Sequence, residues 1–160
     1  MSTRRSHLTG LGLTAAGVAV AATAAPAPAL AQEQPEPLAL VARRTEITLP
    51  DLPALGVPYV CLLDLFDEAD TQVGTATAGA TVVGVTVDGP VVLASVVLHL
   101  ADGEIHYQRV MDRFGDFPRT AVGAILGGTG SYQDATGEVE IAWPDEEQID
   151  LLVRTAAPGG

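Results

Sequence analysis

Two residues that could act on a small molecule stand two positions apart in the second half of the chain. Tyr107 offers an aromatic ring on which a substrate could stack, and Arg109 offers a guanidinium group that could polarise a carbonyl. Residues two apart in a strand point to the same face, so an inward Tyr107 implies an inward Arg109. A buried Arg109 would be costly without an anionic or carbonyl partner. The alternative is an outward Arg109 that pairs with a surface acid. The two residues are the predicted catalytic groups.

Apolar residues on two further predicted strands could enclose this pair. Glu138 and Glu140 should face water, so the apolar residues that alternate with them should face inward. The same alternation places every second residue of the apolar run 58–66 on one face. The predicted substrate-binding residues on these two strands are Cys61, Leu63, Val139, Ile141 and Trp143, and Met111 joins them from the strand of Tyr107.

Other groups of reactive residues match no established site. The glycines of residues 127–130 lack the Lys-Ser/Thr pair of a phosphate-binding loop and are better explained as a tight turn. The acidic residues within 64–70 do not have the spacing of an EF-hand and predict an acidic turn. His99 and His106 flank a predicted hairpin without a third ligand. We therefore predict no metal site.

Several catalytic classes are excluded by residues that the chain lacks. It contains no lysine, which rules out Schiff-base chemistry, and no Gly-x-Ser-x-Gly nucleophile elbow. Cys61 is the single cysteine, so no internal disulfide can form, and its apolar surroundings favour a buried small hydrophobe. We expect activity, if any, without a cofactor.

The 160-residue chain carries 20 acidic and 8 basic residues, a formal charge of −12. Such a charge repels phosphate backbones and anionic membrane surfaces, so we expect neither nucleic acid nor a membrane as the partner of the mature domain. Solubility outside the cell is the simpler explanation of the charge.

The first 31 residues have the features of a cleavable export signal. Arg4 and Arg5 precede an uncharged apolar run at 8–25, and small residues at 29 and 31 suit a signal peptidase that cuts after Ala31. The run is rich in alanine and glycine and is followed by two prolines, which makes it a poor permanent membrane anchor. The two arginines fit a twin-arginine signal and an ordinary secretion signal equally well. The exported chain would keep six basic residues against 20 acidic ones, a formal charge of −14.

Beyond the export signal, the sequence pattern predicts β-strands along most of the chain. Residues 32–44 are expected to be a disordered leader, 45–155 a β domain and 156–160 a tail. About eight short runs rich in β-branched residues are separated by turn residues, and no window has helical periodicity. The predicted strands are 45–49, 58–66, 71–87, 91–100, 104–111, 119–126, 137–143 and 148–154. This spacing indicates an all-β sandwich or a closed barrel.

Three segments, in order, resemble the allene oxide cyclase-like and dirigent-like barrel superfamily. Residues 124–139, AILGGTGSYQDATGEV, resemble its A-I-x-G-G-T-G-x-Y-x-x-A-x-G-x-V motif. Residues 65–75, LFDEADTQVGT, are similar to its L-Y-D-x-x-G-x-x-V-G-T hairpin, and residues 100–105, LADGEI, to its L-x-D-G-x-I turn. The resemblance covers most of residues 45–154. It implies an eight-stranded antiparallel β-barrel with an apolar cavity, assembled as a homo-oligomer, either a dimer or a trimer.

The resemblance also implies a way of acting on small molecules. Members of the superfamily use the cavity to hold a flexible reactive substrate in one conformation, and some close rings by cycloaddition. Our first hypothesis is therefore a cyclase or isomerase that acts on an apolar, polyketide-like or lipid-like substrate. Trp143 and Tyr107 would stack on the substrate, and Arg109 would polarise its carbonyl. Cys61 and Met111 would form part of the cavity wall. The second is a non-catalytic exported binder of apolar compounds, dirigent-like or lipocalin-like. The third is a barrel filled by its own side chains.

Overall fold

The computed structural model describes residues 35–51, 54–87, 89–112 and 116–156. The predicted export signal at 1–31 lies outside these residues, as does most of the predicted C-terminal tail. Among the described residues, no helix is long and apolar enough to cross a membrane.

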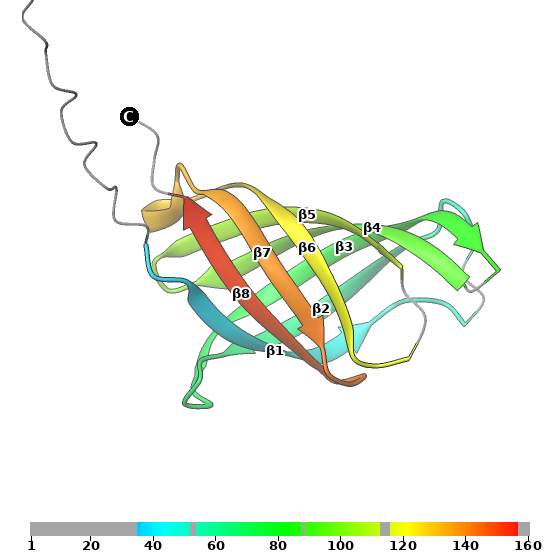
Figure 1. The fold of residues 1–160 in the computed structure, drawn as a ribbon, viewed down its shortest axis with the longest axis horizontal. Helices are drawn as coiled ribbons and strands as arrows, with labels where there is room; N and C mark the ends of the chain where they lie inside the picture. The colour runs from blue at the N-terminus through cyan, green and yellow to red at the C-terminus, as the bar shows by residue number, and fades with distance from the viewer. Residues whose placement is uncertain (1–34, 52–53, 88, 113–115, 157–160) are drawn as a thin grey trace, which may run out of the picture. The chain divides into compact units, whose positions relative to one another are not determined.

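Eight antiparallel strands follow one another in chain order and close into a barrel (Figure 1), because β1 pairs with β8 as well as with β2. One short 3-10 helix, η1 (Gly130–Tyr132), interrupts the connection between the sixth and seventh strands. The all-β, eight-stranded antiparallel barrel predicted from the sequence is confirmed. The strands are β1 (Leu38–Ile47), β2 (Pro58–Phe66), β3 (Gln72–Thr86), β4 (Gly89–Leu100), β5 (Gly103–Asp112), β6 (Arg119–Gly128), β7 (Thr136–Trp143) and β8 (Gln148–Ala156).

The first strand begins earlier than the sequence predicted. β1 starts at Leu38, inside the stretch 32–44 that was expected to be a disordered leader. The prolines at 35 and 37 suggested disorder, but Leu40 and Ala42 are buried and alternate with more exposed neighbours. Pairing with both β2 and β8 satisfies the backbone of this segment. The barrel therefore includes residues 38–44.

Closure of the sheet gives every strand an inner and an outer row of side chains. On β3, Ala76, Ala78 and Ala80 are buried, whereas Thr77 and Gly79 between them are exposed. β7 follows the same rule, because Val139 and Ile141 are buried while Glu138 and Glu140, which alternate with them, are exposed. The inner rows of all eight strands form one hydrophobic core.

One seam of the barrel is only partly paired. The β5–β6 ladder runs from Ile105 to Gln108 on the β5 side. Beyond Gln108, the described part of β5 from Arg109 to Asp112 makes no ladder pairs with β6. The seam therefore opens toward the end of the barrel where β5 finishes and β6 begins.

The glycine-rich connection after β6 closes the opposite end. Thr129 donates its backbone N–H to the Glu104 carbonyl oxygen at 2.9 Å, and Ser131 donates to that of Asp102 at 2.9 Å. The segment thus lies on the turn between β4 and β5. It is longer than the tight turn that the sequence predicted, because Gly127 and Gly128 still belong to β6 and residues 129–135 with η1 make the connection. Gly137, the second residue of β7, has φ of 131°, and a Cβ there would overlap the carbonyl oxygen of Arg154 on β8.

Replacing Gly137 with alanine should lower the free energy of unfolding by about 2 kcal/mol or more, because the positive φ and the contact with Arg154 both oppose a side chain. Gly79→Ala is the matched control, since Gly79 lies on β3 with open space around it. The control should leave stability unchanged or slightly raised. Urea unfolding followed by circular dichroism measures both variants. Equal stability of the two variants would contradict this role of Gly137.

Candidate functional site

The two ends of the barrel interior are filled differently. At the end covered by η1, large aliphatic side chains meet, and Leu65, Ile105, Val139 and Val153 are at most 1% exposed. This end is called here the filled end. The opposite end, called here the open end, lies where β5 and β6 separate.

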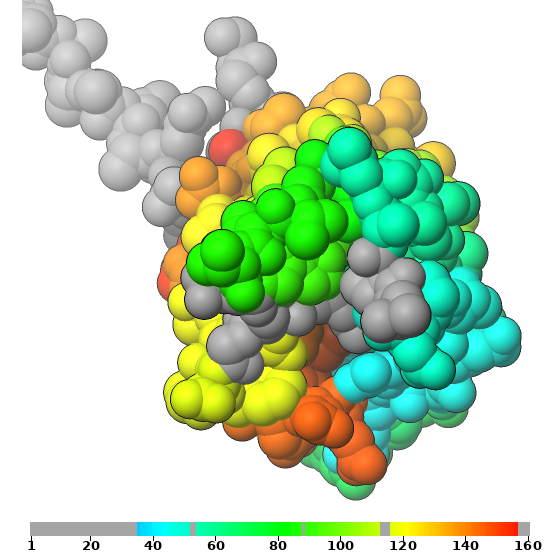
Figure 2. All heavy atoms as spheres, turned by 90° about the vertical axis from the view of Figure 1, so that its right-hand side faces the viewer, coloured from blue at the N-terminus to red at the C-terminus, as the bar shows by residue number. Residues whose placement is uncertain are grey.

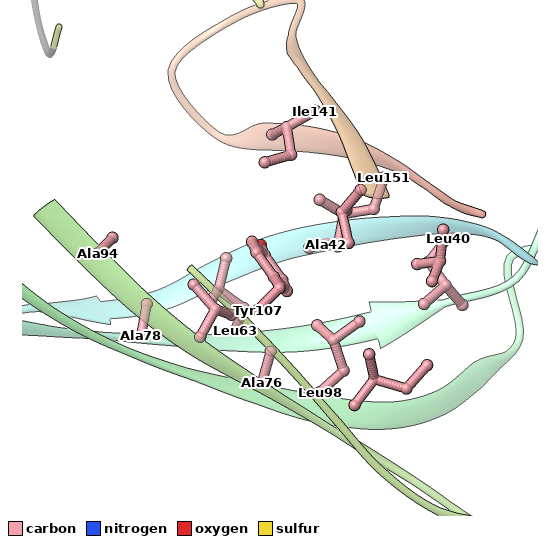
Figure 3. Close-up of a cluster of buried hydrophobic side chains, with 14 of the residues drawn as sticks. Leu40, Ala42, Leu63, Ala76, Ala78, Ala94, Leu98, Tyr107, Ile141 and Leu151 are labelled. Carbon is pink, nitrogen blue, oxygen red and sulfur yellow. The ribbon is translucent and has the colours of Figure 1, made fainter. Parts of the chain in front are cut away.

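A row of alanines leaves space toward the open end. Ala76, Ala78 and Ala80 from β3 and Ala94 from β4 point inward. Figure 3 shows the short side chains of Ala76, Ala78 and Ala94 beside the larger Leu63 and Tyr107. Because an alanine fills little of its inward position, the larger side chains opposite cannot close the interior completely.

The resulting cavity has a volume of about 60 Å³ and opens at one end. Figure 2 looks onto the open end and shows a hollow between the start of β6 in yellow, the β7–β8 turn in orange and the end of β1 in cyan. Ligand pockets for drug-sized molecules are typically about 300–1,000 Å³. A substrate of that size must therefore displace side chains that occupy the interior here.

Six of the eight predicted site residues line this cavity. They are Cys61, Leu63, Tyr107, Arg109, Met111 and Trp143. The other two, Val139 and Ile141, point inward as predicted but are 0% and 2% exposed and belong to the packed core rather than to the cavity wall. The alternation that put them on the inner face does not reveal how deep along the barrel they lie.

Arg109 points into the barrel, which decides between the two orientations left open by the sequence. Its guanidinium carbon lies 4.6 Å from the centre of the Trp143 ring, a cation–π distance. Its Nε and Nη1 atoms are buried. The guanidinium group thus occupies the space in front of the Trp143 ring.

Tyr107 lies deeper, on the same face of β5. It is 3% exposed, and its ring packs so closely against Gly123 of β6 that a Cβ at Gly123 would overlap it. Burial raises the pKa of Tyr107, and the charge of Arg109 opposes this only in part. Tyr107 therefore remains a neutral phenol at working pH and can donate a hydrogen bond to an oxygen in the cavity.

The structure adds residues that sequence reasoning did not select. Arg44, Arg119 and Glu146 line the cavity at the open end. Arg119 lies against Phe117, with its guanidinium carbon 4.1 Å from the ring centre. Arg44 follows Leu40 and Ala42 in the inward row of β1, so the alternation would have placed it inside had the strand been started at Leu38.

The acidic cluster and the two histidines lie away from this cavity. Asp67 accepts hydrogen bonds from the backbone N–H groups of Ala69 and Thr71 at 2.9 and 2.8 Å, which is the geometry of an acidic turn. His99 and His106 are joined by Glu104, whose two carboxylate oxygens lie 3.0 and 3.1 Å from their ring nitrogens. No metal-binding group of three or more such ligands occurs among the described residues.

Comparison with known proteins identifies the fold. No protein-family model matches the chain, and no curated protein sequence does. Pyocyanin demethylase superposes with a TM-score of 0.59 at 24% identity, covering 72% of this chain and 97% of that one. AbnU, an exo-specific intermolecular Diels-Alderase, gives 0.59 at 16% identity, covering 76% and 97%. The Diels-Alderase AbmU from Streptomyces koyangensis gives 0.61 at 16%, covering 81% and 72%. The chain thus shares its barrel fold with these proteins.

The surface cluster of Glu104 predicts a pH-dependent contribution to stability. Hydrogen bonds from His106 and His99 lower the pKa of Glu104 below its ordinary value of 4.5. A lowered folded-state pKa stabilises the fold above the unfolded pKa, and this contribution is lost as pH falls through the folded pKa. Thermal unfolding should show Glu104→Gln melting below the wild type at neutral pH, with the gap closing in acid. Glu138→Gln, on the outer face of β7, is the control. A gap that widens in acid would contradict the assignment.

Proposed function

We propose that the chain binds an apolar small molecule in the open end of the barrel and promotes its ring closure or isomerisation, in the manner of the allene oxide cyclase-like proteins. The observation that carries this proposal is a one-ended apolar cavity in which two polar groups, Tyr107 and Arg109, stand side by side on β5. The filled end limits how far a ligand can enter, and the alanines of β3 form the surface on which the ligand would lie.

Conformational restriction is the main effect expected of such a wall. A flexible polyene has many conformers and few of them bring its reacting ends together, so holding it folded removes much of the entropic barrier. A larger substrate would displace the Arg109 side chain from the face of Trp143 and stack there in its place. The guanidinium group could then reach an oxygen of the bound substrate.

The two polar groups would polarise the substrate electronically. Tyr107 and Arg109 can both donate hydrogen bonds to a carbonyl conjugated with the reacting double bonds, and so stabilise negative charge that develops on its oxygen. A cycloaddition or isomerisation of this kind conserves all atoms and electrons, with bonds formed and broken only within the substrate. The proposal is supported by the fold that the chain shares with two Diels-Alderases.

A non-catalytic binder is the second candidate function. The predicted export signal favours it, because a carrier of apolar compounds has a clear use outside the cell. It requires the same cavity but no effect of Tyr107 or Arg109 on reaction rate.

Occupation of the cavity can be tested with the fluorescent apolar probe N-phenyl-naphthylamine. Ala78→Val adds two methyl groups to the floor of the cavity and should weaken binding about tenfold, while the cavity accepts the extra volume with little loss of stability. Gly79→Ala, one residue along β3 but on the outer face, should bind the probe as the wild type does. Unchanged binding by Ala78→Val would place the probe elsewhere and sink both candidate functions.

Catalysis can be tested with a decatrienone that carries a diene and an enone on one chain and cyclises slowly by itself. The protein should accelerate closure and give one stereoisomer in excess. Tyr107→Phe and Arg109→Met should each lose about tenfold or more of the acceleration, since each removes a preorganised donor. Arg154→Met, which alters only an outer-face pair with Glu140, should not. If the protein binds N-phenyl-naphthylamine but the decatrienone closes at the uncatalysed rate to a racemic product, the second candidate function, a non-catalytic binder, is favoured.

A further inference from the structure

Charged residues are distributed unevenly around the outside of the barrel. β1, β7 and β8 carry them on their outer faces, with Arg43, Glu138 and Arg154 among the most exposed. β3 and β4, which are 15 and 12 residues long, contain no aspartate, glutamate, lysine or arginine. A chain with a formal charge of −12 thus keeps one side of its barrel almost without charge.

Large apolar side chains are exposed on the same side. Val60 of β2 is 42% exposed, Val110 of β5 60% and Leu126 of β6 64%. Along the described strands β1, β7 and β8, no large apolar side chain is exposed to a similar extent. An exposed apolar patch with a polar border marks an interaction site.

The strand register gathers these residues into three rows that run across the strands. The rows are formed by the outward-facing residues of 58–62, 77–81, 93–97 and 106–110, which lie opposite one another in the ladders of β2 to β5. We call this surface the neutral face. Its one titratable outward side chain, His106, lies at the margin and contacts Glu104.

The neutral face has a shallow groove across its middle. Gly79 and Ser95 pair in register there, and nothing lies within 4 Å of the position that a Cβ of Gly79 would take. Leu93 and Val97 flank Ser95 on β4 and form a ridge on either side of the groove. The side-chain amide of Gln108 donates to the Ser95 hydroxyl at 3.0 Å, so this polar pair is satisfied within the face. Side chains of two such faces can interdigitate as they do between packed sheets.

The distribution of charge favours a second copy of the chain as the occupant. β4 and β8 lie on opposite sides of the closed ring of eight strands. Two molecules that meet through their neutral faces therefore keep their charged sides far apart, which minimises the repulsion between two acidic chains. A basic partner would instead be attracted to the glutamates of β7.

The size of the neutral face is that of the central part of an interface. Five residues on each of four strands cover about 300 Å², from a rise of about 3.3 Å per residue and a strand spacing of about 4.8 Å. A standard interface buries about 800 Å² per partner and has a charge-depleted centre within a polar rim. Glu104 and Asp112, at the two ends of β5, fall at the rim. Acidic residues at the rims of both copies weaken the association, so the dissociation constant should be on the order of micromolar.

We propose that a second copy of this chain docks on the neutral face, giving a symmetric dimer in which the middle rows of the two molecules are in contact. A two-fold interface uses the same patch on both partners, which a surface with matching ridges and a groove permits. This inference goes beyond the proposed function, because the outward residues of the neutral face do not line the cavity.

Sedimentation velocity over a range of protein concentrations tests the dimer. The wild-type protein should be monomeric when dilute and dimeric well above about 10 μM. Ser95→Glu places a carboxylate at the centre of the face in both copies and should raise the dissociation constant about a hundredfold or more. Ala39→Glu, which adds the same charge to the outer face of β1, is the matched control and should dimerise like the wild type.

A charge-reversed pair of variants separates a broken interface from a damaged fold. Ser95→Arg alone should also remain monomeric, but an equal mixture of Ser95→Arg and Ser95→Glu should associate more tightly than either variant alone. Thermal unfolding of each variant confirms that the barrel is intact.

A wild-type protein that stays monomeric at every concentration, or that forms a trimer, would overturn the symmetric dimer. Dimerisation of Ser95→Glu at the wild-type concentration, or a mixture that associates no better than its components, would overturn the assignment to the neutral face. Binding of N-phenyl-naphthylamine by Ser95→Glu should match that of the wild type, so none of these outcomes decides the proposed function.

Discussion

The need to fill the inside of a closed eight-stranded barrel governs the rest of the structure. Inward positions alternate along every strand, and the space they share is fixed by the strand number. At the filled end, Leu65, Ile105 and Val139 occupy this space completely. Toward the open end, β3 contributes only alanine at positions 76, 78 and 80, and the balance is made up by the long side chain of Arg109 lying on Trp143. The cavity, its depth and its polar groups all follow from this difference in side-chain size.

The same arrangement places three arginines around the apolar interior of an acidic protein. Carboxylates on the outer faces of the strands keep the molecule soluble, and two of them hold Arg43 and Arg154 in surface ion pairs. Two of the inner arginines, Arg109 and Arg119, lie with their guanidinium groups against the rings of Trp143 and Phe117.

Strand alternation was sufficient to predict most of the site, and its limits are physical. Turn residues and β-branched runs located eight strands, and the glutamates of β7 showed that Trp143 faces inward. The phase of β5 could not be deduced in this way, since its polar residues occupy both faces and either orientation of Arg109 was consistent with the pattern. Alternation also does not show which inward side chains border a cavity, which is why Val139 and Ile141 were assigned to the wall although they belong to the packed core. Arg44 was overlooked because the prolines before Leu38 suggested that no strand began there. Arg119 pairs in register with Trp143 and shares the inner row of β6 with Gly123 and Ile125, so alternation along that strand would have placed it inside.

The central claim is that the open end of the barrel is a ligand site with an apolar floor formed by the alanines of β3. The most direct measurement is a crystal structure of the protein with 1-bromonaphthalene, in which the anomalous signal of bromine locates the ligand. The account predicts bromine inside the open end, beside Ala78 and Ala94, with the Arg109 side chain moved off the Trp143 ring. Bromine found only on the outer surface would contradict it.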